Sequence, residues 1–247
     1  MGDAIETIEG WYALHDFRLV NWSLWNSGLL AEREEVFQSL KKIVNGWGAV
    51  EETGQGSTGL YHIIGHKADL LLVNLRPTIS ELFDAELEID KSPASRFLTK
   101  SYSYFSVVEL SKYLVKGEVD PHNLPGTKER LYPTLPKTEY VCFYPMNKRR
   151  EGSDNWYTLT KDQRREIMKE HGILGHKYAQ KVTQIITGSQ GLDDWEWGVT
   201  LYANDILDFK KLIYEMRFDE ASARFAEFGP FLIGRRITID RLYSILE

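Results

Sequence analysis

The sequence predicts an α+β protein made of two tandem ferredoxin-like repeats, each a β-α-β-β-α-β unit, that form a dimeric α/β barrel within one chain. The first observation behind this prediction is an internal repeat. Gly65–Leu75 aligns without gaps with Asp193–Ala203, an offset of 128 residues (193 − 65), and the same offset carries Pro93–Phe97 onto Ala221–Phe225. Because a strand, the helix after it and a pentapeptide agree in one register, a repeated structural unit explains the match better than chance.

The second observation is the order of the expected elements, which is the same in both halves. Short β-branched and aromatic runs bounded by Gly, Asn or Asp predict strands, and longer runs with helical spacing predict helices. In the first half the order is strand, helix, two strands, helix and strand, at Gly10–Arg18, Ala31–Asn45, Gly59–Gly65, Asp69–Leu75, Ile79–Asp90 and Tyr102–Leu110. In the second half it recurs at Glu139–Tyr144, Lys161–Tyr178, Lys181–Thr187, Glu196–Tyr202, Ile206–Arg217 and Gly229–Ile237.

A connector is expected between the halves, which gives the division 1–111, 112–138 and 139–247. Residues 112–138 hold four of the eight prolines of the chain, a density typical of extended segments. Two interpretations stay open for it. It is either a flexible linker or an ordered loop that brings Arg130 and Tyr132 to an anionic ligand.

The first strand of the second half carries the most chemistry. Its side chains alternate, so Tyr140, Cys142 and Tyr144 are expected on one face, and Pro145 is expected to end the strand. For a buried tyrosine, core packing is the usual role. The cations that follow, Lys148, Arg149 and Arg150, add a second possibility, because they could bind ligand carboxylates beside an oxidisable phenol.

The helix Lys161–Tyr178 begins with a capping box, Thr160 with Gln163 three residues on. Its apolar face carries Ile167, His171, Leu174 and Tyr178, so His171 is expected to point inward. A lone histidine on such a face is more often a core residue than a ligand. Neutral imidazole is nevertheless a common axial ligand of haem iron, and both interpretations stay open.

Other chemistries find less support. His176 lies five residues after His171, which is not the spacing of a zinc site on one helix face, and His66 has no partner at metal-ligand spacing. No Gly-x-Ser-x-Gly, Gly-x-Gly-x-x-Gly or phosphate-loop motif occurs. Gln184, on the strand after the helix, could either satisfy a polar group of the sheet or offer a hydrogen bond to a small iron-bound molecule.

Composition narrows the class of protein. The chain has 247 residues, 43% of them hydrophobic, enough for a substantial core. A formal charge of -6 argues against a nucleic-acid role. The one cysteine, Cys142, excludes an intramolecular disulfide and is expected to be buried. The first residues do not resemble a signal peptide, and no run of 18 apolar residues exists, so a cytoplasmic protein without a membrane span is expected.

At these residues the chain resembles the chlorite dismutase superfamily, and within it the branch of coproheme decarboxylases that acts in haem synthesis. The resemblance covers Gly10 to Leu246. Its most specific segments are Tyr144–Arg150, Glu170–Gly175 and Glu220–Phe231. It implies the tandem ferredoxin-like fold, a homopentamer, a ligand site in the C-terminal half and, as a further partner, a transient contact with a ferrochelatase-type donor.

The resemblance also implies residue roles. His171 is the proximal iron ligand, Tyr144 the redox-active residue, and Lys148 the group that orients the reacting carboxylate. The remaining positions bind or line the porphyrin: Arg130, Tyr132, Lys148 and Ser222 hold propionates, Met146 and Trp156 line the ring, and Gln184 faces the distal side. Because the chlorite-degrading branch has a distal arginine where this chain has Gln184, the decarboxylase is favoured.

The implied reaction is a hydrogen-peroxide-dependent oxidative decarboxylation of two propionates of iron-coproporphyrin III, through a radical on Tyr144. The substrate serves as its own cofactor, and the product is haem b. Two alternatives are retained: a non-catalytic haem carrier or sensor, and a haem peroxidase or chlorite-degrading enzyme that acts on outside molecules.

Overall fold

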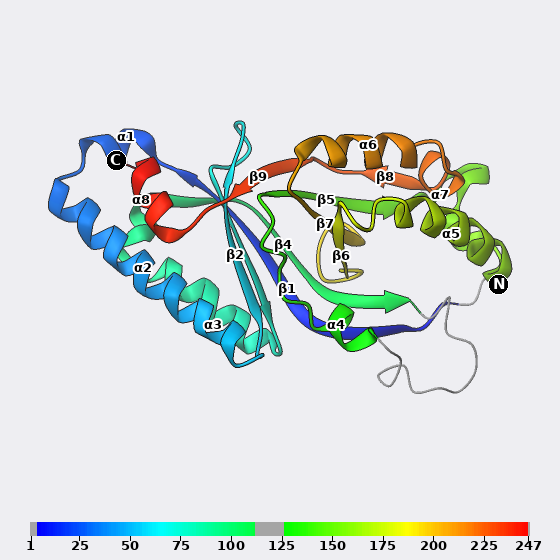
Figure 1. Ribbon diagram of the computed structural model, residues 1–247, viewed down its shortest axis with the longest axis horizontal. Helices are drawn as coiled ribbons and strands as arrows, with labels where there is room; N and C mark the ends of the chain where they lie inside the picture. The colour runs from blue at the N-terminus through cyan, green and yellow to red at the C-terminus, as the bar shows by residue number, and fades with distance from the viewer. Residues whose placement is uncertain (1–3, 112–125, 247) are drawn as a thin grey trace.

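The computed structural model of the chain describes residues 4–111 and 126–246. Its named strands form one nine-stranded sheet in the order β7-β6-β4-β1-β3-β2-β9-β5-β8, and β5 also pairs with β7. Every pairing between these strands is antiparallel. The predicted α+β class is therefore confirmed. Figure 1 shows the helices gathered in two groups, one toward each end of the molecule, with the strands between them.

The first half contains the six predicted elements and two short helical additions. Its elements are β1 (Thr7–Val20), α1 (Trp22–Ser27), α2 (Leu30–Glu52), β2 (Ser57–Ile63), β3 (Leu70–Arg76), α3 (Ile79–Asp90), a 3-10 turn (Pro93–Arg96) and β4 (Leu98–Ser111). The capping box of α3 shows why this helix starts where the sequence predicts. The hydroxyl of Thr78 accepts from the backbone of Glu81, and the Glu81 carboxylate accepts from the backbone of Thr78.

The rest of the chain contains the other six predicted elements together with several short additions. Its elements are α4 (Thr127–Leu131), β5 (Tyr140–Lys148), 3-10 turns at Gly152–Asp154 and Trp156–Thr158, α5 (Lys161–His176), β6 (Thr183–Gly188), β7 (Trp197–Ala203), α6 (Ile206–Met216), α7 (Glu220–Ala223), β8 (Ala226–Phe228), β9 (Leu232–Arg236) and α8 (Ile239–Leu246). The capping box predicted for α5 is present at Thr160 and Gln163.

The alternation of β5 separates two hydrophobic cores. Val141 and Phe143 are buried in a central core that also holds Phe17 and Tyr61 from the first half. Cys142 and Tyr144 point the other way, into a core with Tyr178, which follows α5, and with Phe209 and Leu212 of α6. The predicted alternation of this strand is therefore confirmed, and so is the burial of Cys142, which is 1% exposed.

Pro145 does not end β5, contrary to the sequence-based expectation, because the strand changes partner at that point. Residues Tyr140–Phe143 pair with β9, whereas Met146–Lys148 pair with β8. The Pro145 carbonyl accepts from the backbone N–H of Gly229, 2.8 Å away, in the short link between β8 and β9. The N–H that proline lacks falls at this change of partner, where the ladder does not need it.

The C-terminal helix α8 packs on the first half of the molecule. Ile239, Leu242 and Leu246 join the core formed by α2, α3 and their strands, and the indole N–H of Trp25 donates to the carbonyl of Leu246, 2.6 Å away. Figure 1 shows α8 beside α2, at the opposite end of the molecule from α5. The end of the chain therefore completes the core of its beginning.

Of the predicted connector, residues 112–125 lie outside the described residues. The remainder starts with Gly126, whose φ of 75° is in the left-handed region, and turns into α4. The ring of Tyr132 then lies edge-on to Trp11 of β1, with centroids 5.7 Å apart. In the described part of the chain, no helix is long and apolar enough to span a bilayer.

Candidate active site

The helix-covered face of the second-half sheet is only partly closed by α5. On the sheet, Gln184 is exposed and Ile186 is 42% exposed, although both lie on the face that α5 and α6 cover. On the helix, His171 and Leu174 are only half-buried. The principal contacts of α5 are with α6 and α7. Side chains of both α5 and the strand beneath it therefore remain accessible to solvent where the two face each other.

Strand register places four predicted site residues on that face. Residues that lie directly opposite each other on neighbouring strands share a face of the sheet. Tyr144 of β5 lies opposite Val199 of β7, and Val199 lies opposite Ile186 of β6; Leu201 of β7 lies opposite Gln184 of β6. Side chains two residues apart on one strand share a face, so Met146 and Lys148 follow Tyr144. Tyr144, Met146, Lys148 and Gln184 are thus brought onto the layer that α5 covers.

His171 is held by a carboxylate from the link between α6 and α7. Its Nδ1 lies 3.0 Å from Oδ2 of Asp219, and the imidazole is 26% exposed. Ser222 donates to the same carboxylate through its backbone N–H, at 2.9 Å, and through its hydroxyl, at 3.1 Å. Burial alone would raise the pKa of Asp219, but the hydrogen bonds from His171 and Ser222 outweigh it and hold that pKa below its usual value.

This arrangement leaves the second ring nitrogen of His171 available. When Nδ1 donates to a carboxylate, Nε2 is the basic nitrogen, and this is how metal-binding histidines are normally oriented. Beside the imidazole, a side chain at Gly172 would meet nothing within 4 Å, and one at Gly175 would meet only the Met216 methyl group at 3.8 Å. A flat ligand therefore meets little obstruction from this part of α5.

Lys148 is a poorly solvated cation. Its Nζ lies 4.4 Å from the centroid of the Trp156 ring, which itself lies edge-on to Phe225 at 5.5 Å. Burial lowers the pKa of Lys148 to about 8, against the opposing influence of Asp219 and Glu196. Within the described residues it has no carboxylate within ion-pair distance. A buried ammonium without a close counter-ion favours the binding of an anion.

Tyr144 is a neutral, buried phenol. It is 6% exposed, and its ring lies 4.6 Å from that of Phe231 and 5.8 Å from that of Phe228. Burial raises the pKa of Tyr144, and the nearby Arg217 opposes this shift. The guanidinium carbon of Arg217 lies 3.6 Å from the centre of the Phe228 ring. The site therefore contains a second cation close to the phenol.

Two of the predicted site residues lie elsewhere. Arg130 is exposed on α4, which packs against β1 and β4, and Tyr132 contacts Trp11. In the portion of the chain that the structure describes, neither residue has a hydrogen bond, ion pair or ring contact with the group around His171. Trp156 and Ser222, in contrast, are 5% and 6% exposed within that group.

Three residues of the site were missed by sequence reasoning: Arg217, Asp219 and Glu196. Asp219 does show a local signal, since it caps α7 by accepting from the backbone of Ser222. Its contact with His171, 48 positions away, has no counterpart in the local pattern. Polar contacts of this kind depend on how two helices meet, which periodicity does not specify.

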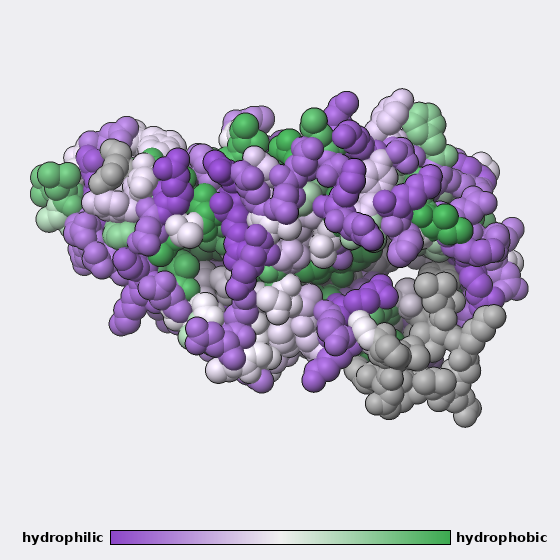
Figure 2. Space-filling model, in the orientation of Figure 1, coloured by the Kyte–Doolittle hydropathy of each residue, from purple (hydrophilic) through white to green (hydrophobic). Residues whose placement is uncertain are grey.

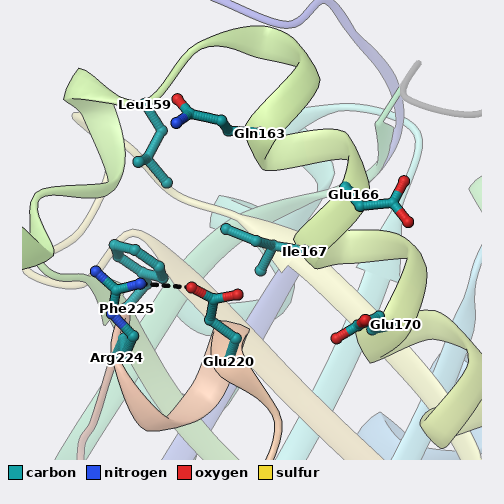
Figure 3. A pocket seen from close by; sticks show the side chains of 8 residues that line it. All are labelled: Leu159, Gln163, Glu166, Ile167, Glu170, Glu220, Arg224 and Phe225. Carbon is teal, nitrogen blue, oxygen red and sulfur yellow. Dashed lines mark hydrogen bonds and ion pairs between the residues drawn. The ribbon is translucent and has the colours of Figure 1, made fainter.

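A separate groove of about 350 Å³ lies between the start of α5 and α7 (Figure 3). It is lined by Leu159, Gln163, Glu166, Ile167, Glu170, Glu220, Arg224 and Phe225. Figure 3 shows Ile167 and Phe225 on its inner side and the Glu220–Arg224 ion pair at its edge. None of His171, Tyr144 and Lys148 lines it, but Phe225 does, and its ring contacts Trp156, so the groove adjoins the candidate site.

The donor set fits an iron porphyrin with carboxylate side chains. Among the described residues, no cluster of three His, Cys, Asp or Glu could hold a metal by itself. A single imidazole supported by a carboxylate suits the axial position of a macrocycle that supplies the other ligands. A buried ammonium, a serine and an aromatic wall are the groups that propionates and a flat ring would need.

Comparison with known proteins gives the relationships of the chain. The model of the chlorite dismutase family matches residues 33–237. Coproheme decarboxylases from two strains of Thermus thermophilus are 52% identical over 240 residues, which cover 97% of this chain and 95% of each relative.

Solved structures agree with this. A protein described as a novel haem-binding protein from Thermus thermophilus superimposes with a TM-score of 0.95 at 50% identity, covering 100% of this chain and 98% of its own. A variant of chlorite dismutase from Candidatus Nitrospira defluvii is similar in fold, with a TM-score of 0.78 at 20% identity, over 96% of this chain and 95% of its own.

Proposed function

Because the chain belongs to the chlorite dismutase family, we propose that it is a coproheme decarboxylase, an oxidoreductase that converts iron-coproporphyrin III into haem b. The identity of 52% over almost the full length of curated coproheme decarboxylases supports this specific activity. Within the structure, the observation that carries the proposal is the His171–Asp219 pair, on the layer that also holds Tyr144 and Lys148.

Each of the two reacting propionates loses carbon dioxide and becomes a vinyl group. The balance for one group is propionate, one hydrogen peroxide and one proton giving vinyl, carbon dioxide and two waters. The carbon–carbon bond to the carboxylate breaks, a hydrogen leaves the neighbouring β-carbon, and peroxide accepts the two electrons. The iron of the bound substrate supplies the oxidising chemistry.

The residues of the chain bind, orient and move protons. Nε2 of His171 binds the iron, and Asp219 fixes the imidazole in that tautomer. The Lys148 ammonium holds the carboxylate that is about to be lost. Tyr144 gives up its phenolic hydrogen and then takes the hydrogen from the β-carbon. Its buried surroundings keep the phenol neutral before the reaction, so proton and electron leave together.

The other predicted residues have supporting roles in this proposal. Met146 and Trp156 line the ring and Gln184 faces the distal side. Ser222 is kept as a propionate partner on the strength of the family resemblance, and its hydroxyl would have to turn away from Asp219 to donate to a carboxylate. Arg130 and Tyr132 are kept as propionate partners on the strength of the family resemblance. Their position on and beside α4 means that they would reach the ligand from the first half of the molecule.

Replacement of Tyr144 by Phe tests the proposal. The variant is expected to bind coproheme with an unchanged Soret band, because Phe keeps the ring between Phe228 and Phe231. With peroxide added, loss of carboxyl groups, followed by mass spectrometry of the porphyrin, should slow on the order of 100-fold or more. Tyr140→Phe is the matched control, because Tyr140 lies four residues earlier on the same face of β5, and this variant should retain activity.

The alternatives give different results in the same experiment. A haem carrier or sensor would release no carbon dioxide, either as the unaltered protein or as the Tyr144→Phe variant. A peroxidase would oxidise an added phenol far faster than it decarboxylates the porphyrin. Both alternatives are contradicted if coproheme incubated with the unaltered protein and peroxide loses two carboxyl groups in succession.

We also infer that the two halves are ferredoxin-like repeats, with the sequence division 1–111, 112–138 and 139–247, that close into a dimeric barrel. Strand order supports this, since β4-β1-β3-β2 in the first half corresponds to β9-β5-β7-β6 in the second. The pairs β2–β9 and β4–β6 then join the two sheets at both edges.

The proposal extends to assembly and location. We propose a homopentamer in the cytoplasm that receives its porphyrin through a transient contact with a ferrochelatase-type donor. Exposed apolar side chains on two helices support self-association, Phe83 on α3 at 58% and Tyr214 on α6 at 64%. Figure 2 shows hydrophobic residues in separate places on a largely hydrophilic face. Light scattering of the purified protein measures the subunit number.

A further inference from the structure

Glu196, just before β7, is the meeting point of the segments that carry Lys148 and Trp156. Its Oε2 accepts from the backbone N–H of Lys148 at 2.8 Å, and its Oε1 accepts from the hydroxyl of Tyr157 at 2.6 Å. Its own backbone N–H donates to Oδ1 of Asn147, also at 2.8 Å. The carboxylate is 13% exposed. One side chain therefore ties the end of β5 to the 3-10 turn Trp156–Thr158.

These contacts fix the surroundings of the Lys148 amine. The amine lies over the Trp156 ring, and Trp156 is the neighbour of Tyr157. The backbone N–H of Trp156 donates to the carbonyl of Arg149 at 2.9 Å, which closes the loop between the two segments. Glu196 thus holds both the backbone from which Lys148 extends and the turn on which its amine rests.

Two carboxylates from different elements work against the effect of burial on the pKa of the Lys148 amine, Asp219 and Glu196. Asp219, from the link between α6 and α7, is already occupied by His171 and Ser222. Glu196 comes from the β6–β7 connection, and a third charge, Arg150, lies 3.9 Å from its Oε1. Since Asp219 is committed to the imidazole, Glu196 is the acidic group whose contacts are dedicated to the Lys148 segment.

We propose that Glu196 is a positioning residue for the decarboxylation, which fixes Lys148 and keeps its amine charged so that it binds the reacting propionate as an ion pair. The inference rests on the proposed function for the identity of the anion. Glu196 itself does not touch the porphyrin in this scheme. It acts through Lys148.

The direction of its effect follows from charge. Burial lowers the pKa of Lys148 to about 8, and first Asp219 and then Glu196 work against that shift. Loss of the Glu196 charge lowers this pKa further. Above its pKa the amine is neutral and the ion pair is lost, so the pH at which coproheme affinity falls should move downward.

The test uses Glu196→Gln, which keeps an acceptor oxygen for the Lys148 N–H but removes the charge. In the porphyrin-free full-length protein, competitive acetylation at a series of pH values, read by peptide mass spectrometry, gives the titration midpoint of the Lys148 amine. This midpoint should fall by about one pH unit. Coproheme affinity from Soret titrations should match the unaltered protein at pH 6 and be roughly tenfold weaker near pH 8.5.

Two further variants separate charge from structure. Glu196→Asp keeps the charge but cannot reach both partners, so it should keep the Lys148 midpoint and weaken affinity equally at every pH. Glu109→Gln is the matched control, because Glu109 is another half-buried carboxylate that accepts from a neighbouring side chain, Nε1 of Trp197 at 2.9 Å. It should leave the Lys148 midpoint unchanged.

An unchanged Lys148 midpoint in a folded Glu196→Gln variant would overturn the inference. So would a loss of affinity of the same size at pH 6 and pH 8.5. Failure of the proposed function has a different signature: no carbon dioxide is released by the unaltered protein, while the midpoint of Lys148 still moves in Glu196→Gln.

Discussion

Asp219 accepts from Nδ1 of His171, and this leaves Nε2 as the nitrogen available for the proposed iron. The imidazole is only partly shielded, so without the carboxylate it would be free to rotate or to change tautomer. Supporting groups of this kind commonly contribute 10- to 100-fold to the affinity of a metal site. The same carboxylate also accepts from Ser222, so one residue links His171, the proposed iron ligand, to Ser222, a proposed propionate partner.

Replacement of Asp219 by Asn should therefore weaken coproheme binding by roughly 10- to 100-fold and shift the Soret band. The neutral amide no longer stabilises an imidazole that donates through Nδ1. Glu220→Gln is the control, because the adjacent carboxylate binds Arg224 and not the imidazole. Titration of the porphyrin into both variants measures the effect. Equal affinity in the two variants would mean that His171 needs no support from Asp219.

At the scale of elements, the change of partner along β5 places the site. The strand pairs with β9 before Pro145 and with β8 after it, which carries Met146 and Lys148 beyond the end of β9. Gly229 makes this possible. A Cβ there would lie 2.7 Å from Cγ of Pro145 and 2.9 Å from the Trp195 ring, closer than side chains approach in folded proteins.

Gly229→Ala is accordingly expected to destabilise the protein by about 1–3 kcal/mol, the usual cost of overpacking a buried contact. Gly46→Ala gives the opposite expectation. Gly46 lies inside α2 and a Cβ there meets nothing within 4 Å, so the free energy of unfolding should rise by roughly 0.5–1 kcal/mol. Denaturant unfolding of both variants measures the difference. If Gly229→Ala is as stable as the parent, the backbone near Pro145 is free to move.

Elements were predictable here because periodicity encodes them, whereas the contacts between elements were not. The alternation of Tyr140, Cys142 and Tyr144 and the cap at Thr160 both have local causes. The continuation of β5 through Pro145 depends on where β8 and β9 begin, some 80 residues later. The roles of Asp219 and Glu196 likewise arise from side chains that meet only after folding.

At the scale of the whole molecule, the two halves share one sheet, and the last helix of the second half packs on the first. β2 pairs with β9, β4 pairs with β6, and α8 covers the core of the first half. The site lies at the opposite end from α8 (Figure 1), but the strands that carry its residues are continuous with those on which α8 packs. Such an arrangement favours unfolding as a single cooperative unit.

Leu242→Ala tests this cooperativity. Leu242 is 2% exposed in the core formed with α2, so its truncation should cost about 2–5 kcal/mol. If the halves unfold together, the loss of helical signal and the release of bound coproheme should move to lower temperature by the same amount. Leu207→Ala, at a site that is 52% exposed on α6, should move neither. A variant that loses the structure around α8 while it still holds the porphyrin would show that the halves unfold independently, and that the shared sheet couples them only weakly.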